Sequence, residues 1–211
     1  MFVKNAMISK HKVHYLNAGT SVGEALSFLE EKKIDGAPIL NGSDYLGIVT
    51  KWSIYEAGFT STLKNNEFLT ATKVEDIAIK KNHVIDEKAV FEETLLEVKD
   101  IPFIAVVGDK EEFLGIVTRF DVLEQFQSAF GMKKKGIRIS FSSIESEGRI
   151  ARLASITSQF HQNIISLATF DETDKLVRRI VMRIEPSTDF EKYLDRLEKN
   201  GFQILDIKTI D

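Results

Sequence analysis

The chain has 211 residues and a formal net charge of −4, from 28 basic and 32 acidic side chains. Its hydrophobic share of 43% and its charged share of 28% are those of an ordinary globular protein, which excludes a disordered or collagen-like chain. The absence of cysteine excludes disulfides, thiol catalysis and thiolate metal sites, and the lack of a basic excess argues against a primary nucleic-acid role.

The apolar segments predict neither a membrane span nor a secretion signal. The longest apolar runs, such as residues 101–107, are far shorter than the ~20 residues that a spanning helix needs. The first residues, MFVKNAMISKHK, lack the apolar core of a signal peptide. We therefore expect a soluble, cytoplasmic protein that has no membrane partner.

A sequence repeat organises the first part of the chain. Residues 45–54 read YLGIVTKWSI and residues 113–122 read FLGIVTRFDV, so five consecutive positions, LGIVT, are identical. Each copy predicts a strand (13–16 or 83–85), a helix (21–32 or 88–98), a strand (37–40 or 104–107), a turn (41–44 or 108–111), the LGIVT strand and a second helix. Such a unit buries one face only, so we expect the two copies to share a core.

The two copies, their spacing and the helix after LGIVT resemble a tandem pair of CBS domains, a Bateman module, over about residues 1–130. The resemblance implies a flat, pseudo-twofold pair that dimerises and binds adenosine-containing ligands in clefts between the repeats. It places repeat 1 at residues 1–62 and repeat 2 at residues 63–130.

The ligand pattern of this family ends each repeat with threonine or serine, two further residues and aspartate, and Thr118, Arg119, Phe120 and Asp121 match it. A helix N-terminus binds phosphate well, and Arg119 can add a charged fork. Asp121 can accept both hydroxyls of a ribose. The same pattern is also a capping box that needs no ligand, and both roles can hold together.

Each cleft of a CBS pair takes residues from both repeats. The resemblance therefore assigns to the Thr118 cleft a further set: Lys12, Val13, His14, Ile34, Asp35, Gly36, Ala37 and Phe103. Gly36 and Ala37 would leave room for a flat base, and Lys12 would contact phosphate. The alternatives are ordinary core packing for Ile34 and Phe103 and a solvated surface position for Lys12.

The first copy departs from the pattern, because Ser53 stands where aspartate is expected. Serine can cap a helix but is a poorer acceptor for ribose hydroxyls. We therefore expect a second, weaker cleft, which would be formed by Thr50, Lys51, Ser53, His83 and Val84.

The C-terminal part begins with GMKKKG at residues 131–136, which predicts a solvated linker. The next segments predict strands at 137–141, 164–170, 176–184 and 202–207 and helices at 148–162 and 189–200. This is the ferredoxin-like βαββαβ order, so the whole chain is assigned to the α+β class.

Residues 137–211 resemble an ACT domain in their element order and in Glu145 and Gly148, which lie between the first strand and the first helix. The resemblance implies an amino-acid site at Glu145 and Gly148, although the usual proline before the glycine is missing. The alternative is that Gly148 only makes a tight turn and the domain serves dimerisation.

A CBS pair followed by an ACT-like domain resembles the acetoin utilization (AcuB-type) family and CBS proteins that bind cyclic di-AMP. The resemblance implies a stand-alone regulatory homodimer that binds an adenine nucleotide and signals to an unidentified protein partner. Cyclic di-AMP is the preferred nucleotide, ahead of AMP, ADP or ATP.

We expect no catalytic residues, cofactor or metal, since the four histidines lack a carboxylate cluster and no phosphate loop or nucleophile elbow occurs. An amino-acid sensor with the CBS pair as a dimerisation scaffold, and an interaction subunit without a ligand, are the alternatives.

Overall fold

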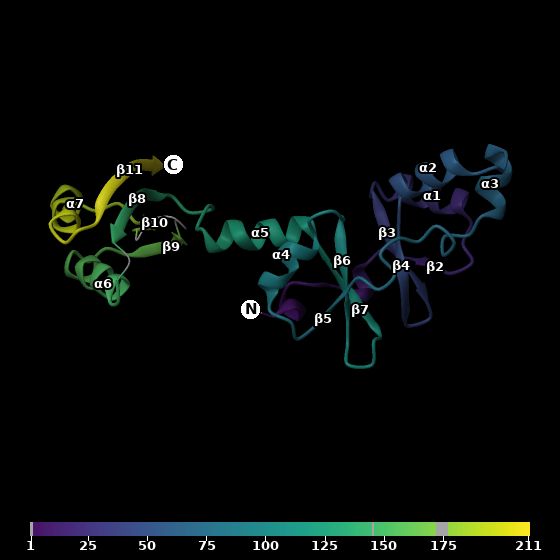
Figure 1. The fold of residues 1–211 in the computed structure, drawn as a ribbon, viewed down its shortest axis with the longest axis horizontal. Coiled ribbons are helices and arrows are strands. Elements are labelled where there is room, and N and C mark those ends of the chain that lie inside the picture. Colours follow the sequence, from purple (N-terminus) through teal and green to yellow (C-terminus); the bar gives the residue numbers. More distant parts are fainter. Residues whose placement is uncertain (1, 145, 172–176) are drawn as a thin grey trace. The chain divides into compact units, whose positions relative to one another are not determined.

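The computed structural model describes residues 2–144, 146–171 and 177–211 (Figure 1). The chain divides into two compact units, Met1–Leu123 and Glu124–Asp211, each of which is described by itself. Within the described ranges, no helix combines the length and the apolar character needed to cross a bilayer.

The first repeat packs a small sheet against helices. Its elements are β2 (Leu16–Asn17), α1 (Val22–Glu31), β3 (Gly36–Asn41), β4 (Asp44–Thr50), α2 (Lys51–Thr60) and α3 (Asn65–Ala71). The sheet order is β2-β3-β4, with β2 and β3 parallel and β3 and β4 antiparallel.

Helix α1 begins at a capping box of Ser21 and Glu24, and the hydrogen bonds from Ser21 lower the pKa of Glu24. It buries Val22, Ala25 and Leu29 in the core of the repeat.

The second repeat repeats the hairpin and the helix that follows it. Its elements are β5 (Val84–Asp86), η3 (Phe91–Glu93), α4 (Thr94–Glu97), β6 (Phe103–Val107), β7 (Phe113–Thr118) and α5 (Arg119–Ala129). The sheet order is β1-β7-β6-β5, so its edge strand β1 (Ile8–Ser9) comes from the N-terminal segment of the chain. This segment also forms the short turns η1 (Val3–Asn5) and η2 (Lys10–Lys12).

The helix predicted at 88–98 is confirmed only in part, because η3 and α4 cover residues 91–97 and the first residues of the range are not helical. The carbonyls of Glu87 and Ala89 accept hydrogen bonds from the backbone N–H groups of Lys4 and Val3, both at 3.0 Å. These two carbonyls therefore bond to a distant segment of the chain, and not to N–H groups of a helix that starts at residue 88. The strand predicted at 13–16 is likewise reduced to β2, which begins at Leu16.

The glycines of the two LGIVT copies let one segment pass very close to another. Ile8 pairs with Ile116 in β7, and Ile79 makes the corresponding bridge to Ile48 in β4. A Cβ atom on Gly115 would stand 2.1 Å from the carbonyl oxygen of Ile8, and one on Gly47 would stand 2.8 Å from that of Ile79. The repeated glycine is thus required by backbone approach.

The hairpin turns of the two repeats also meet. The backbone N–H of Phe113 donates to the carbonyl of Ser43 at 2.9 Å, and the ring of Phe113 stacks on Tyr45 with centroids 6.2 Å apart. Burial raises the pKa of the Tyr45 hydroxyl, which donates to the Lys80 carbonyl. The two repeats are therefore joined at both the strand crossing and the turns.

The C-terminal unit confirms the βαββαβ prediction and is consistent with an ACT-like fold. Its elements are β8 (Gly136–Ile144), α6 (Arg149–Gln159), β9 (Ile164–Asp171), β10 (Val177–Ile184), α7 (Phe190–Glu198) and β11 (Gln203–Ile210). The antiparallel sheet has the order β11-β8-β10-β9, as a ferredoxin-like topology requires. Phe141, Tyr193 and Phe202 are among its fully buried side chains. The buried Arg183 donates to the carbonyls of Gly131 and Lys134, so the GMKKKG segment is held against this unit.

We expect Gly115→Ala to lower the free energy of unfolding of the first unit by about 3 kcal/mol, because the new methyl group meets a backbone oxygen that cannot rotate away. Urea unfolding followed by the fluorescence of Trp52, the single tryptophan, measures this. Gly108→Ala is the control: its Cβ would meet only the flexible carboxylate of Glu112, so we expect a loss below about 1 kcal/mol. Equal stability of the two variants would contradict the crossing argument.

Candidate functional site

A cleft of ≈460 Å³ lies within the first unit and is lined by residues of both repeats. Its lining comes from four stretches of the chain: Ile8, Lys12, Val13 and His14; Ile34, Asp35, Gly36 and Pro38; Pro102 and Phe103; Ile116, Thr118 and Phe120. Eight of the residues expected at the Thr118 cleft are therefore brought together here: Lys12, Val13, His14, Ile34, Asp35, Gly36, Phe103 and Thr118.

The N-terminal wall of the cleft follows directly from the strand crossing. After β1 pairs with β7, the turn η2 closes with a hydrogen bond from Val13 N–H to the Lys10 carbonyl at 3.2 Å. Val13 is then buried, whereas Lys12 and His14 remain exposed along the cleft. The imidazole of His14 meets the ring of Phe28 edge-on, at 6.3 Å between centroids. One cation and one histidine are thus placed at this wall.

The opposite wall is the turn between α1 and β3. Lys33 takes a positive φ of 55°, which ends the helix and directs Ile34, Asp35 and Gly36 into the cleft. A Cβ on Gly36 would stand 2.9 Å from the Thr50 methyl group, so packing between β3 and β4 already requires glycine there. Ala37 lies in the core of the first repeat, outside the cleft lining.

Thr118 and Asp121 form a capping box at the start of α5. The Asp121 carboxylate accepts from the backbone N–H of Thr118 at 3.0 Å and from its hydroxyl, both through Oδ2. The backbone N–H of Asp121 donates in return to the Thr118 hydroxyl at 3.1 Å. Asp121 thereby orients Thr118 in the cleft wall but is not itself among the lining residues. Its other oxygen, Oδ1, is the one that can turn to a ligand.

The structure places Arg119 away from the cleft lining. Its guanidinium donates to the carbonyls of Val98, Lys99 and Ile101, at 3.0 to 3.3 Å. The side chain therefore holds the turn before Pro102 and Phe103, which carry one wall of the cleft. The three residues after Thr118 thus have different surroundings. Arg119 bonds the turn before Pro102, Phe120 lines the cleft, and Asp121 bonds Thr118.

The five residues expected to form a second cleft do not share one lining. Thr50 and Ser53 are buried and bond each other, with both backbone-to-hydroxyl distances at 2.9 Å. Lys51 pairs with Asp35 at 3.5 Å, and His83 lies 3.0 Å from the Glu97 carboxylate. Val84 lines a different cavity of ≈600 Å³, together with Asp44, Tyr45, Asn82, Val107, Glu111 and the cations Lys81 and Lys110.

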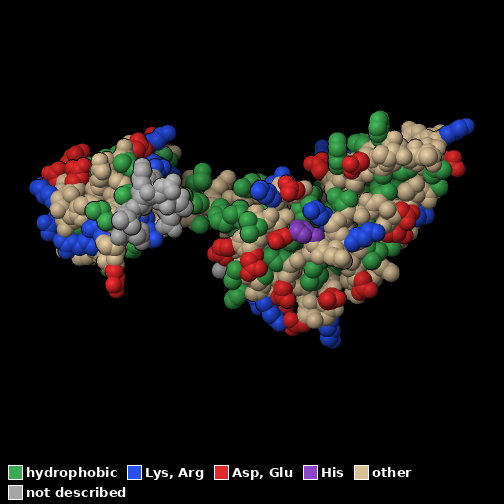
Figure 2. Space-filling model, in the orientation of Figure 1, with side chains coloured by type: hydrophobic (Ala, Val, Ile, Leu, Met, Phe, Trp, Pro, Cys, Tyr) green, Lys and Arg blue, Asp and Glu red, His purple; other side chains and the backbone are tan. Residues whose placement is uncertain are grey.

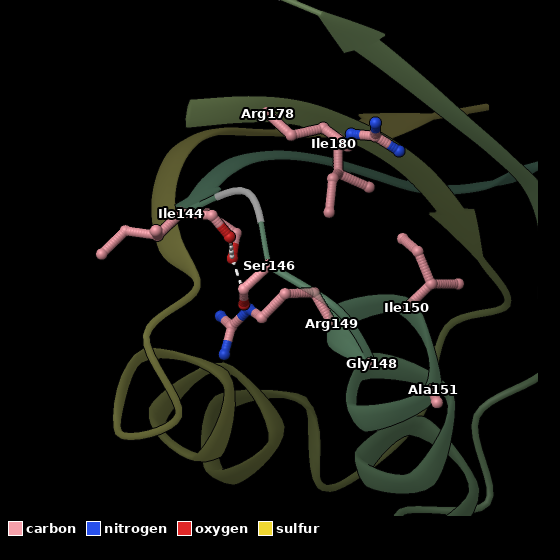
Figure 3. Close-up of a pocket in the computed structure, with 9 residues that line it drawn as sticks. Ile144, Ser146, Gly148, Arg149, Ile150, Ala151, Arg178 and Ile180 are labelled. Carbon is pink, nitrogen blue, oxygen red and sulfur yellow. Dashed lines mark hydrogen bonds between the residues drawn. The ribbon is translucent and has the colours of Figure 1, made fainter. Parts of the chain in front are cut away.

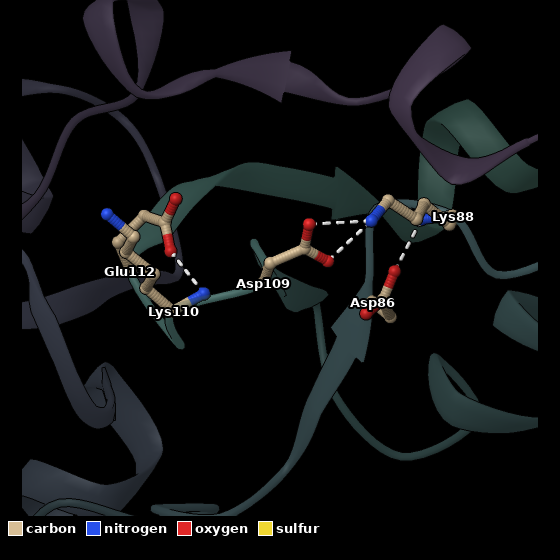
Figure 4. Close-up of polar contacts among 5 residues, drawn as sticks. All are labelled: Asp86, Lys88, Asp109, Lys110 and Glu112. Carbon is tan, nitrogen blue, oxygen red and sulfur yellow. Dashed lines mark hydrogen bonds and ion pairs between the residues drawn. The ribbon is translucent and has the colours of Figure 1, made fainter.

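The charged loops at this second cavity are held by local bonds (Figure 4). Lys88 pairs with Asp109 at 2.5 Å, and that hydrogen bond raises the pKa of the Lys88 ammonium group. The Glu112 carboxylate accepts from the backbone N–H of Lys110 at 2.9 Å. These contacts fix the turn of the second hairpin.

The C-terminal unit has a cavity of ≈220 Å³ at the start of α6 (Figure 3). Gly148 precedes the helix with a φ of +79°, and Arg149 and Ser143 lie in the lining. The Arg149 side chain is bound to the Ser143 hydroxyl and to the carbonyls of Asn200 and Gly201. Glu145, the other residue expected at an amino-acid site, lies outside the described residues.

Sequence reasoning missed five residues of the Thr118 cleft: Ile8, Pro38, Pro102, Ile116 and Phe120. Ile116 belongs to the repeated LGIVT segment and Phe120 to the Thr-x-x-Asp pattern itself, so both carried a signal. Ile8 carried none, because its place depends on a strand pairing more than 100 residues away in sequence. In the described part of the chain, no group of three or more His, Asp or Glu side chains gathers as a metal site would need.

Comparison with known proteins supports the CBS resemblance. The family model described as "CBS domain" matches residues 3–59 and 74–128, just over half of the chain. No curated protein matches the chain.

Solved structures with this fold include several CBS proteins. A CBS-domain protein of unknown function from Bacillus anthracis is 28% identical, with a TM-score of 0.54 over 60% of this chain and 93% of that one. The Listeria monocytogenes CbpB protein in complex with c-di-AMP is 28% identical, with a TM-score of 0.53 over 59% of this chain and 94% of that one. CBSX2 in complex with AMP, at 24% identity and a TM-score of 0.52 over 63% and 98%, shares the fold.

The two capping boxes make a matched pair for measuring stability. We expect Asp121→Ala and Ser53→Ala each to lower the free energy of unfolding by about 1 kcal/mol, because each removes the reciprocal bonds of one helix start. Urea unfolding followed by Trp52 fluorescence checks both. No loss in either variant would show that the caps do not stabilise the unit.

Proposed function

Because the chain belongs to the CBS-domain family, we propose that it is a cytoplasmic regulatory protein, without catalytic activity, that binds an adenine nucleotide in the cleft of Thr118. The observation that carries this proposal is the single cleft of ≈460 Å³ that gathers Lys12, His14 and Thr118 from both repeats. Its volume lies within the range of about 300–1,000 Å³ that is usual for small-molecule sites.

Cyclic di-AMP is our preferred ligand, with AMP, ADP and ATP next. The Listeria monocytogenes protein that shares 28% of its residues was solved in complex with c-di-AMP. In our proposal Asp121 accepts ribose hydroxyls, Lys12 contacts phosphate, and Ile34 and Phe103 line the apolar wall for the base. Both signs of charge mix on the face of the molecule drawn in Figure 2, which fits a small charged ligand better than a polyanion.

We propose one ligand per chain. Thr118 lies in the cleft wall, whereas its counterpart Thr50 is buried against Gly36 and bonded to Ser53. The buried pair of hydroxyls offers a ligand neither a carboxylate nor open space. The two repeats would then differ in function although their caps share one geometry.

Regulation would follow from a change in the first unit on ligand binding. A nucleotide that contacts both repeats stabilises the arrangement of the repeats that it fits best, and so alters the surface offered to a protein partner. The size of the shift equals the difference in affinity of the ligand for the two arrangements.

Titration calorimetry of the full chain with cyclic di-AMP, AMP, ADP and ATP tests the proposal. We expect micromolar or tighter binding of at least one nucleotide, at one site per chain. Asp121→Ala and Thr118→Ala should weaken binding about tenfold or more, since a charge-assisted hydrogen bond is lost. Ser53→Ala, which removes the equivalent cap outside the cleft, should leave the affinity unchanged. Absence of binding by all four nucleotides, or equal affinity of all variants, would refute the assignment.

Sensing of an amino acid by the ACT-like domain is the second candidate function, favoured by the ≈220 Å³ cavity beside Gly148. The carbonyl bonds of Arg149 count against it, because they occupy one of the two cations that line this cavity, the other being Arg178. Amino acids would therefore be titrated next if the nucleotides fail to bind.

We also propose that the protein is a homodimer. Trp52, Tyr55 and Phe59 lie three and four residues apart on α2 and are 72%, 55% and 93% exposed, which leaves an apolar stripe facing solvent. Hydrophobic side chains stand out over α2 in Figure 2. A second copy that covers this stripe would remove it from water.

We expect Phe59→Ser to raise the dissociation constant of the dimer by about tenfold or more, since a buried aromatic ring is a typical centre of binding energy. Light scattering after gel filtration, over a range of concentrations, measures it. Leu96→Ser removes another largely exposed apolar side chain, outside the stripe, and should have no effect. A monomeric wild-type chain, or equal effects of the two changes, would reject the stripe as the interface.

A further inference from the structure

Phe120 lines the Thr118 cleft and is nevertheless 71% exposed. It lies on the first turn of α5, directly between Arg119, which is turned under the wall, and Asp121, which is bonded to Thr118. The ring contacts found among the described residues do not include Phe120. An aromatic face is therefore presented to solvent at the rim of the cleft.

The exposure of Phe120 is not explained by the packing of α5. The buried side chain of the first turn is Val122, two positions further on, so the helix attaches to its repeat without the phenylalanine ring. The corresponding residue of the first repeat is Trp52, which is 72% exposed but stands beside the buried Thr50 and Ser53. Of these two exposed aromatic rings, only Phe120 stands at the cleft described above, whereas Trp52 belongs to the apolar stripe of α2.

The size of the cleft limits how much of a ligand it encloses. Its ≈460 Å³ falls in the lower half of the usual range for small-molecule sites, about 300–1,000 Å³. A mononucleotide can lie between the walls of Ile34 and Phe103, whereas a dinucleotide, with about twice the atoms, extends beyond the rim. The part that extends carries a second base, and Phe120 is the aromatic residue of the lining that stands at the helix start.

We propose that Phe120 is the residue by which this cleft distinguishes an adenine dinucleotide from a mononucleotide, its ring stacking on the base that lies outside the cleft. This inference rests on the proposed function and adds a specificity residue to it. Stacking suits the position because every base has a π-face and the contact needs no hydrogen-bond partner. The gain is confined to ligands that have a second base, so the same ring leaves the affinity for AMP unaffected.

The test is calorimetric titration of the full-length chain and three variants with cyclic di-AMP and with AMP. One base stacked on an aromatic ring contributes between about fivefold and a hundredfold to affinity. We expect Phe120→Ala to weaken binding of cyclic di-AMP by about tenfold or more and binding of AMP by less than about twofold. Phe120→Trp should keep the affinity for cyclic di-AMP. Leu96→Ala, the control, removes an exposed apolar side chain outside both the cleft and the α2 stripe and should change neither affinity.

Three results would overturn the inference while the proposed function stands. These are unchanged binding of cyclic di-AMP by Phe120→Ala, an equal loss for both nucleotides, and an equal loss in Leu96→Ala. Light scattering of the same samples identifies the reason: a smaller particle in Phe120→Ala would assign the ring to a protein contact instead. If the wild-type chain does not bind cyclic di-AMP, the inference is refuted, and absence of binding by AMP, ADP and ATP as well would refute the proposed function itself.

Discussion

The close passage of Ile8 across Gly115 is the contact on which the first unit depends. A side chain at Gly115 would stand 2.1 Å from the Ile8 carbonyl oxygen, so only glycine allows β1 to pair with β7. That pairing attaches the first residues of the chain to the sheet of the second repeat. The chain must then return to the first repeat at β2, and Lys12, Val13 and His14 lie on this return path. The cleft is therefore a geometric consequence of the crossing.

The second crossing, at Gly47, shows that this arrangement is a property of the duplication. Ile79 bridges to Ile48 as Ile8 pairs with Ile116, and each crossing takes place at the glycine of an LGIVT segment. Two nearly equivalent joints therefore bind the repeats to each other. Equivalence of the backbone does not make the two sites equivalent, since one helix cap carries a carboxylate and the other a buried hydroxyl.

The start of α5 shows how one short segment serves structure and recognition together. Arg119 supports the wall that carries Pro102 and Phe103, and Asp121 fixes the hydroxyl of Thr118. Both charged side chains thus hold residues of the cleft wall in place. Phe120, placed between them, is left to face the solvent at the rim. The sequence pattern predicted ligand contacts for Thr118, Arg119 and Asp121. In the folded chain Thr118 lines the cleft, whereas Arg119 and Asp121 bond residues in its wall or next to it.

The sequence by itself determined the repeat, the α+β class and the βαββαβ order, because these depend on local periodicity and on the identity of LGIVT at two places. It also brought most of the cleft residues together, from Lys12 to Thr118, through the family pattern. Only the tertiary structure decided that residues 87–90 are not helical, that Arg119 points away from the cleft and that Ile8 belongs to it. Each of these depends on bonds between segments far apart in the chain: the N–H groups of Val3 and Lys4, the carbonyls of Val98 to Ile101, and the pairing of β1 with β7. Local propensity depends on neighbouring residues in the sequence. It therefore predicts where helices and strands lie, but not which distant segments they contact.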